Sequence, residues 1–262
     1  MTVTVEYAIV HFNIPMQGIQ IKCNLCGTDD SKLLFIKDSY QVVECNQCGL
    51  SYINPRPLED TLKEKYGGDY SLGYIAKKTS KRKRAKKIVG RIIKIKKEGR
   101  FLDIGCSAGF ILEAARENGF ETYGVDISPH GLRHAREALQ LNVVGGFLQD
   151  IHFPNGFFDV IVMYDVIEHL PDPTKILREI NRIIKSDGLI EIWTPNMGHR
   201  RAKRMGKEWP HIISDHLYYF SLETLGKMLE KVGLYIFKKQ FTLKDTLKIY
   251  IKKRPENLGH HE

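Results

Sequence analysis

The fold is decided by the stretch Phe101-Leu-Asp-Ile-Gly-Cys-Ser-Ala-Gly109, which predicts a short buried strand ending in a glycine-rich turn. An apolar-periodic helix is expected next, from Phe110 to Asn118. A second strand, Glu121 to Val125, ends at Asp126, 17 residues after the last glycine of the turn. This order of strand, glycine turn, helix, strand and acidic residue is typical of a nucleoside-binding α/β unit.

The turn also indicates what kind of ligand the unit binds. A dinucleotide fingerprint needs a glycine where this chain has Ser107, and the Gly-Lys-Ser/Thr of a P-loop is absent. The turn is therefore poorly suited to a pyrophosphate and better suited to the close approach of a small amino-acid moiety. Asp126 would accept hydrogen bonds from both ribose hydroxyls. Taken alone, the glycines are equally consistent with a turn that binds no ligand.

In these motifs the chain resembles the class I S-adenosylmethionine-dependent methyltransferases, from about Arg100 to Lys252. The first motif of that family is Asp-X-Gly-X-Gly-X-Gly, and serine replaces its middle glycine here. The resemblance implies that Gly105 approaches the methionine part of the cofactor, that Asp126 holds the ribose and that Asp150 meets the adenine amine. The cofactor-binding residues that it implies are Asp103, Gly105, Cys106, Gly109, Asp126, Ile127, Asp150, Ile151 and Tyr164.

The alternation of strands and helices after residue 100 predicts an α/β fold, and the resemblance implies a seven-stranded, mostly parallel, doubly wound sheet. Its last two strands are expected at Tyr235 to Gln240 and Thr246 to Lys252, with one of them antiparallel. We therefore expect a cofactor-binding domain at 100–253 and a helical lead-in or lid at 58–99, which begins with a helix from Leu58 to Tyr66.

Two matching cysteine pairs precede these segments. Cys23-Asn-Leu-Cys26 and Cys45-Asn-Gln-Cys48 are separated by 18 residues and are each followed by glycine, a spacing typical of a zinc site. Four thiolates complete a tetrahedral shell with no open position, which indicates a structural metal. Disulfides and a redox dithiol are the alternatives, but a redox pair needs no second copy. The segment between the pairs predicts a hairpin, so residues 20–57 are expected to form a zinc ribbon.

Candidate catalytic residues follow the fourth strand of the sheet. Transfer from a sulfonium is an in-line displacement in which positioning supplies much of the acceleration, whereas an oxygen acceptor also needs a base. His169 lies just after that strand, and His216 lies in the insertion after the fifth strand; Asp165 is the third candidate. Either histidine could instead be structural, and Glu168 is expected to be a solvated or helix-capping carboxylate.

Three further stretches are similar to a subgroup of these enzymes that methylates small molecules, quinones and sugars among them. They are Tyr164-Asp-Val-Ile-Glu-His-Leu-Pro-Asp-Pro173, Thr194-Pro-Asn196 and His216-Leu-Tyr-Tyr-Phe-Ser221. Members of this subgroup with a zinc knuckle and an Asn-Pro-Arg-Pro connector also occur, as at Asn54 to Pro57 here. The leading hypothesis is a methyltransferase for a small molecule, with an oxygen of a sugar or related metabolite as the candidate acceptor.

The charge of the chain leaves a second hypothesis open. The formal net charge is +9, and its excess is concentrated between Lys77 and Lys97, a segment that predicts a helix. Such a run is either a solvated helix face or a contact for a phosphate-bearing substrate or RNA. An RNA methyltransferase is therefore the second hypothesis. A non-catalytic binding module is the third, although the presence of both Asp126 and Asp150 argues against it.

The sequence also bears on location. It contains no apolar run near the roughly 20 residues that span a bilayer, and its first 20 residues lack the pattern of a signal peptide. We therefore expect a cytoplasmic protein that does not enter the membrane. The sequence does not determine the oligomeric state.

Overall fold

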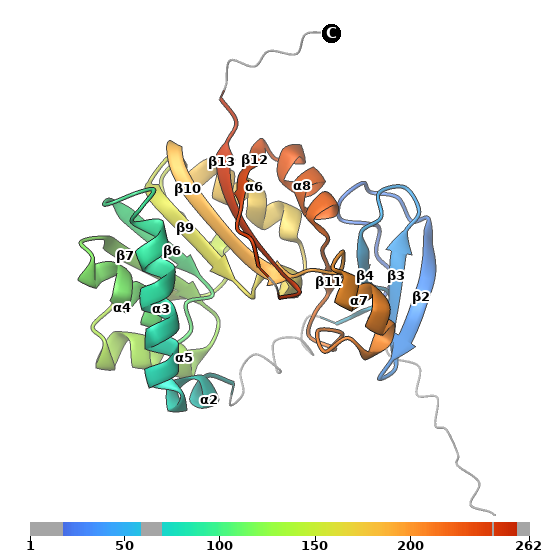
Figure 1. Cartoon of the computed structure of the whole chain (residues 1–262), viewed down its shortest axis with the longest axis horizontal. Helices are drawn as coiled ribbons and strands as arrows, with labels where there is room; N and C mark the ends of the chain where they lie inside the picture. Colours follow the sequence, from blue (N-terminus) through green and yellow to red (C-terminus); the bar gives the residue numbers. More distant parts are fainter. Residues whose placement is uncertain (1–17, 59–69, 243, 256–262) are drawn as a thin grey trace, which may run out of the picture.

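The computed structural model describes residues 18–58, 70–242 and 244–255 (Figure 1). The helix expected from Leu58 to Tyr66 lies outside these ranges except for its first residue. A large sheet with helices on both faces lies beside a small sheet formed mainly by the N-terminal segment (Figure 1). Within the described ranges, no helix has both the length and the apolarity needed to cross a membrane.

The described residues form a seven-stranded sheet in the order β12-β13-β10-β9-β6-β7-β8. All neighbouring strands are parallel except β13, which runs antiparallel to both β10 and β12. This confirms the predicted mostly parallel sheet, including its final hairpin. The strands are β6 (Arg100–Ile104), β7 (Glu121–Asp126), β8 (Val143–Gly145), β9 (Phe158–Tyr164), β10 (Ile184–Pro195), β12 (Leu234–Lys239) and β13 (Thr246–Lys253).

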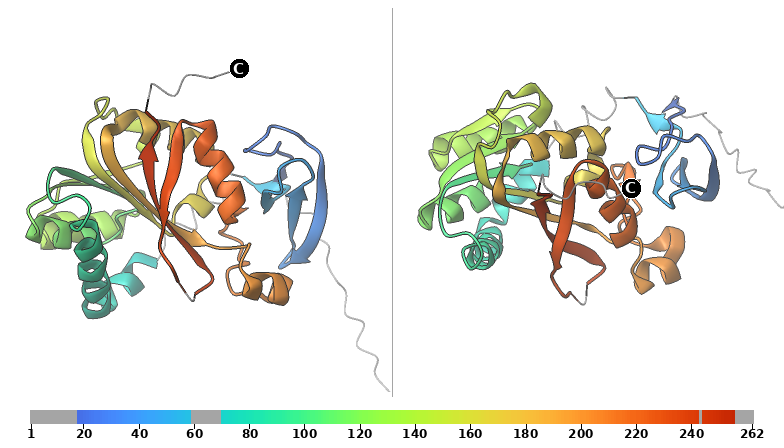
Figure 2. Two further views of the ribbon diagram at one scale, coloured as in Figure 1. Left: turned by 45° about the horizontal axis from the view of Figure 1, so that its top comes forward. Right: turned by 90° about the horizontal axis from the view of Figure 1, so that it is seen from above.

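Alternate residues of each strand build two separate cores. In β9, Ile161 and Met163 pack with helices α6 and α8, whereas Val160 and Val162 pack with α3 and α4 on the other face. The sheet is therefore doubly wound, as expected, and the layers are seen edge-on in Figure 2. The helices are α2 (Tyr70–Ala76), α3 (Lys78–Ile92), α4 (Phe110–Glu117), α5 (Pro129–Arg133), α6 (Pro173–Ile183), α7 (Arg200–Met205) and α8 (Leu222–Lys231).

Three of these helices begin at a Ser or Asp cap. The side chains of Ser128, Asp172 and Ser221 accept hydrogen bonds from backbone N–H groups in the first turns of α5, α6 and α8. Such a cap contributes about 1 kcal/mol to stability. These caps set the helix starts that follow the strand ends, and so help to shape the loops at the carboxyl edge of the sheet.

The N-terminal segment forms a second sheet, in the order β11-β4-β3-β2. Strands β2 (Ser31–Lys37) and β3 (Tyr40–Cys45) form the hairpin predicted between the cysteine pairs. Strand β4 (Ser51–Ile53) pairs with β11 (Tyr218–Tyr219), which comes from the insertion after β10. The small sheet is thus completed by a distant part of the chain. Val43 and Tyr52 join the α6/α8 core, whereas Val42 and Ile53 pack in a separate cluster with Trp209. The two-residue strands β1 (Gly18–Ile19) and β5 (Arg56–Pro57) form a separate antiparallel pair.

Candidate functional site

The turn after β6 is built from backbone conformations that glycine adopts easily. Gly105 and Gly109 have φ angles of 77° and 81°, in the left-handed region. A Cβ atom on Gly105 would lie 2.3 Å from Cγ2 of Val166, so a side chain at this position would collide with the loop after β9. Ser107, at the middle motif position, also has a positive φ of 45°, which explains why the family motif has glycine there.

Asp126 ties the turn to the end of β7. One carboxylate oxygen accepts a hydrogen bond from the backbone N–H of Ser107 and the other accepts from that of Ser128, both at 2.7 Å. Burial raises the pKa of the Asp126 carboxyl even though these N–H groups act in the opposite direction. The carboxylate is only half-buried, and each oxygen keeps a lone pair for a further donor. This arrangement fits the ribose of a nucleoside.

The other residues implied for the cofactor lie at different depths. Asp103 is only 2% exposed, and burial together with the charge of Asp126 raises the pKa of its carboxyl well above the usual value. Cys106 is also buried, whereas Ile127 and Ile151 are half-buried. Asp150 ends the short helical turn 148–150 with its side chain exposed, at the same carboxyl edge of the sheet.

The ends of β9 and β10 form the next part of this edge. The ring of Tyr164 packs edge-on against Trp193 with centroids 5.5 Å apart. Asp165 follows with a φ of 55°, and its backbone N–H donates to the carbonyl of Trp193. The Asp165 carboxylate reaches Nη2 of Arg84 on α3 at 3.2 Å. Helix α3 is thus tied directly to the end of β9.

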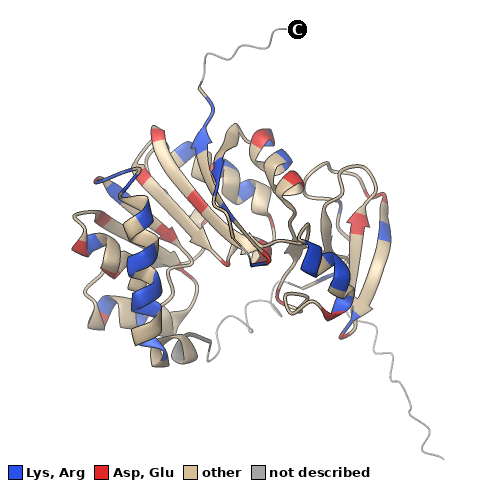
Figure 3. Ribbon diagram, viewed as in Figure 1, with Lys and Arg blue, Asp and Glu red and all other residues tan. Residues whose placement is uncertain are grey.

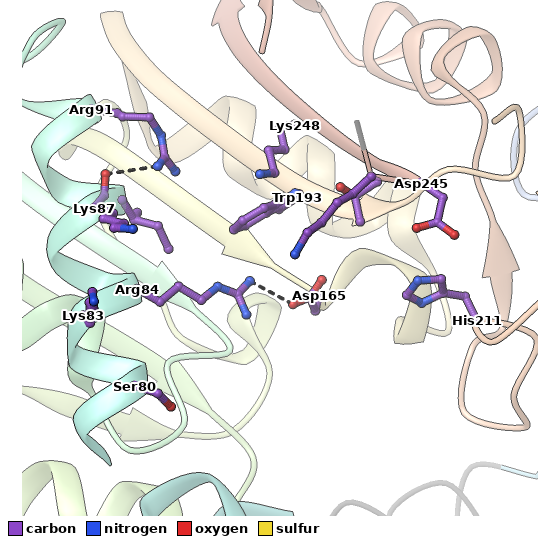
Figure 4. Close-up of a pocket in the computed structure, with 13 residues that line it drawn as sticks. Ser80, Lys83, Arg84, Lys87, Arg91, Asp165, Trp193, His211, Asp245 and Lys248 are labelled. Atoms are coloured by element: carbon purple, nitrogen blue, oxygen red, sulfur yellow. Dashed lines mark hydrogen bonds and ion pairs between the residues drawn. The ribbon is translucent and has the colours of Figure 1, made fainter. Parts of the chain in front are cut away.

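A pocket of about 740 Å³ opens at this point (Figure 4). It lies between α3, the end of β10 and the start of β13, and we call it the basic pocket because Lys and Arg predominate in its lining. Its lining residues are Ser80, Lys83, Arg84, Lys87, Ile88, Arg91, Asp165, Trp193, His211, Lys244, Asp245, Thr246 and Lys248. Of the three candidate bases, Asp165 alone lines it. The volume suits a small molecule.

His169 and His216, far apart in sequence, are brought together with Glu168. The two imidazole rings meet edge-to-face with centroids 4.7 Å apart, and ligand-type atoms of the three residues lie within 4.8 Å of one another. Nδ1 of His169 is 2.8 Å from the carbonyl of Asp215, which fixes the orientation of that ring. Neither histidine lines the basic pocket.

The expectation that Glu168 is solvated or caps a helix is wrong. Its side chain is 1% exposed, because the loop after β9 is covered by the insertion that contains Leu217, whose N–H donates to the Glu168 carbonyl. Burial, and then the charge of Asp165, raises the pKa of the Glu168 carboxyl to about 8. Thr194 donates its hydroxyl hydrogen to one carboxyl oxygen at 2.9 Å.

The environment of the two histidines favours their neutral forms. Burial, and then the charge of His169, lowers the pKa of His216 to about 3. Burial is also the main cause of the lowered pKa of His169. A neutral imidazole can act as a base, but an imidazole with so low a pKa is a weak one. The roles of both histidines as catalytic bases stay predictions.

The four predicted metal-binding cysteines converge on one point. Their sulfur atoms all lie within 4.8 Å of one another, with Cys23 Sγ 3.5 Å from Cys48 Sγ and Cys26 Sγ 3.4 Å from Cys45 Sγ. These separations exceed the roughly 2.05 Å of a disulfide and approach the value of about 3.8 Å that tetrahedral zinc–sulfur geometry requires. Burial raises the pKa of the Cys23 thiol to about 11. The cluster fits a zinc ion, whose charge would stabilise thiolates there.

Several pocket residues were missed in the sequence. Trp193, His211 and Lys248 come from three segments that meet only in the folded chain. Trp193 lies within a strand whose alternation indicates burial, and His211 and Lys248 belong to no motif. The basic segment Lys77 to Lys97 was the one signal present, since its helix supplies Lys83, Arg84, Lys87 and Arg91.

The strand order of the large sheet and the glycine turn at its carboxyl edge are those of the class I methyltransferase fold. This is the family that the sequence motifs resemble. A family model described as a methyltransferase domain matches residues 78–239. This match covers more than half of the chain, so the chain belongs to the methyltransferase-domain family.

Curated relatives and solved structures are consistent with this assignment. The chain is 27% identical to a 2-methyl-6-phytyl-1,4-hydroquinone methyltransferase of Synechocystis over 51% of its length and 45% of that protein's. It is 28% identical to a ubiquinone biosynthesis O-methyltransferase of Aeromonas salmonicida, over 52% of its length and 63% of that protein's. The match thus spans less than two thirds of the length of each of these relatives.

Solved structures share the fold at lower identity. The PH0226 protein of Pyrococcus horikoshii has a TM-score of 0.57 and 19% identity over 66% of this chain and 91% of that chain. An S-adenosylmethionine-dependent methyltransferase of Clostridium acetobutylicum has a TM-score of 0.55 and 13% identity over 70% of this chain and 98% of that chain. At such identities the likeness shows the fold alone.

Proposed function

We propose that this chain transfers a methyl group from S-adenosylmethionine to an oxygen of a small-molecule acceptor. The proposal is carried by the position of Asp126. Two backbone N–H groups orient its carboxylate at the carboxyl edge of the large sheet. The basic pocket opens at the same edge, at Asp165. The relatives named above are methyltransferases of a hydroquinone and of ubiquinone biosynthesis. A sugar or related metabolite is an equally suitable acceptor for a pocket of this size.

The residues of the chain would divide the work between binding and proton removal. When bound, S-adenosylmethionine supplies a methyl group already activated on a sulfonium. Asp126 would hold the ribose hydroxyls and Asp150 the adenine amine, while Gly105 lets the backbone approach closely. Asp165, in the wall of the basic pocket, would accept the proton of the acceptor hydroxyl, with its carboxylate paired to Arg84. His169 and His216 are the alternative bases.

Calorimetric titration of S-adenosylhomocysteine tests the cofactor site. We expect Asp126→Ala to weaken binding by about 2–3 kcal/mol, because charge-assisted hydrogen bonds to the ribose are lost. Asp29→Ala removes an exposed carboxylate from the small-sheet segment and is the matched control, with no expected change. If the folded wild type produced no heat of binding, the non-catalytic binding module would replace the proposed function.

We also propose that Cys23, Cys26, Cys45 and Cys48 bind one structural zinc ion. Four thiolates leave no position for water or substrate, so the ion would stabilise the small sheet and take no part in methyl transfer. Elemental analysis of the purified protein should find one zinc per chain, and Cys26→Ser should lower that content. The control Cys106→Ser alters the buried cysteine of the cofactor turn and should keep the metal. Metal-free wild type with a normal fold would contradict this role.

A further inference from the structure

Positive charge is concentrated in the basic pocket. Six Lys or Arg side chains line it, against two Asp side chains. Four of the six come from one face of α3, the helix that carries basic residues along its length (Figure 3). The other two are Lys244 and Lys248, near the start of β13 on the opposite side. Two separate parts of the chain thus direct positive charge toward one space.

The two acidic residues of the pocket are already paired with other groups. Asp165 forms its ion pair with Arg84. Asp245 accepts a hydrogen bond from Nε1 of Trp209 at 2.7 Å and lies 3.5 Å from Nη1 of Arg201, which is not part of the lining. These carboxylates therefore do not neutralise the lysines of the pocket.

The lysines have no carboxylate of their own. Among the described residues, no acidic side chain lies within ion-pairing distance of Lys83, Lys87, Lys244 or Lys248. Burial lowers the pKa of Lys248, and the neighbouring charges of Arg91, Lys244 and Arg84 lower it further. An anion bound among these groups would relieve their mutual repulsion.

The floor of the pocket adds a flat aromatic surface. Nζ of Lys248 lies 3.7 Å from the centroid of the Trp193 ring, and the guanidinium of Arg84 lies 4.5 Å from it. Figure 4 shows Arg84 and Lys248 approaching this ring from facing elements. The indole Nε1 and the Nε of Arg91 are buried without a hydrogen-bond partner among the described residues. The guanidinium of Arg91 also lies 3.8 Å from Glu191, so the described cations of the pocket that lack a carboxylate are the lysines, and Lys248 shares its space with this ring.

We propose that the methyl acceptor carries a phosphate group and that the basic pocket binds that group through Lys83, Lys87 and Lys248. This inference rests on the proposed methyl transfer and names the chemical class of its acceptor. A phosphate ester is favoured over a single carboxylate because its greater charge and three free oxygens can engage several of the lysines that lack a carboxylate. A pocket of about 740 Å³ holds a small molecule, which favours a phosphorylated metabolite over RNA.

Inorganic phosphate and pyrophosphate are the probes, titrated by calorimetry into the full-length, metal-loaded protein. We expect pyrophosphate to bind and the double variant Lys83→Glu/Lys87→Glu to weaken that binding at least tenfold. Both lysines are exposed on α3, so folding should be unaffected. Lys248→Gln, on the opposite wall, should weaken binding several-fold. Lys94→Glu is the control, because it makes the same kind of charge change outside the pocket and should leave binding intact.

The two probes separate the possible acceptors. Tighter binding of pyrophosphate than of phosphate supports an acceptor linked through a diphosphate, and equal binding supports a monophosphate ester. Wild type that binds S-adenosylhomocysteine but neither probe would overturn the inference and leave the proposed function standing. A single-stranded RNA oligonucleotide that binds tightly, and that pyrophosphate fails to displace, would also overturn it. Absence of S-adenosylhomocysteine binding would remove the proposed function itself.

Discussion

Two halves of the carboxyl edge of the large sheet are built in different ways. The half at β6 and β7 is made of backbone: left-handed residues at 105, 107 and 109, with N–H groups held by Asp126. The half at β9, β10 and β13 is made of long side chains that reach a shared pocket from α3 and β13. Conformational constraint shapes the first half, which we call the donor half because it would hold the methyl donor. Charge shapes the second half, which we call the acceptor half because it would hold the methyl acceptor.

The sign of the charge also differs between the halves. The donor half presents the carboxyl groups of Asp126 and Asp150 at its surface, whereas Lys and Arg predominate in the acceptor half. A cationic sulfonium and an anionic acceptor would each meet groups of opposite charge under the proposed function. The contrast implies that substitutions in the donor half act through backbone strain and direct hydrogen bonds, and those in the acceptor half through charge and pH.

The largest effect is expected at Glu168, behind the acceptor half. Its raised pKa of about 8 means that the folded protein keeps this proton at pH values where the unfolded chain releases it. Stability contributed by the neutral carboxyl is therefore fully present below the ordinary pKa of about 4.5 and is lost as pH rises toward 8. Glutamine stays neutral and keeps an oxygen for the Thr194 hydroxyl. The unfolding free energy of Glu168→Gln minus that of wild type should therefore rise by about 4 kcal/mol as the pH goes from about 5 to about 9.

Urea unfolding at several pH values measures this difference. His169 and His216 lie beside Glu168 and have lowered pKa values, so wild type and variant alike lose stability as pH falls and these histidines protonate in the unfolded chain. Their contribution cancels in the difference. Glu223→Gln, at an exposed site on α8, is the control and should show little pH dependence. A difference between wild type and Glu168→Gln that does not vary with pH would mean that the Glu168 carboxyl is ionised in the folded protein.

The donor half should be most sensitive at Gly105. Alanine there combines a left-handed backbone with a Cβ 2.3 Å from Val166 Cγ2, and we expect a loss of about 3 kcal/mol in unfolding free energy together with weaker S-adenosylhomocysteine binding. Gly119→Ala is the matched control, because φ is 88° there but nothing lies within 4 Å of the new Cβ. That variant should lose only about 1 kcal/mol. Equal losses, measured in urea, would show that Val166 moves aside and that backbone strain alone matters.

The difference between the halves also explains what the sequence could predict. The glycine turn and Asp126 depend on residues within a short stretch, so local motifs were enough to predict the turn and the alternation of strands and helices, and the resemblance implied the mostly parallel sheet. The basic pocket depends on where α3, Trp193 and Lys248 meet, which no local pattern encodes. Glu168 was misjudged for the same reason, because its burial is caused by an insertion almost 50 residues later in the chain.

Salt should separate the two halves further. Between about 0.05 M and 0.5 M sodium chloride, we expect pyrophosphate binding to weaken by about tenfold, because the lysines of the acceptor half are accessible to screening. Binding of S-adenosylhomocysteine should change less than about twofold, since Asp126 forms short hydrogen bonds in a half-buried setting. Parallel calorimetric titrations make the comparison. Equal salt dependence of both ligands would contradict the division of the edge into a constrained half and a charged half.

The smallest effect is expected at Ser107, where the donor half departs from the family motif. Its φ of 45° is strained for serine, and its buried hydroxyl has no hydrogen-bond partner among the described residues. Ser107→Gly relieves both, while the added freedom of the unfolded chain offsets part of the gain, so we expect about 0.5 kcal/mol more unfolding free energy. Affinity for S-adenosylhomocysteine should not change, because the bond to Asp126 comes from the backbone N–H of residue 107. Lower stability or weaker binding in urea and calorimetric measurements would show that the hydroxyl itself has a role, and that this half is not defined by backbone alone.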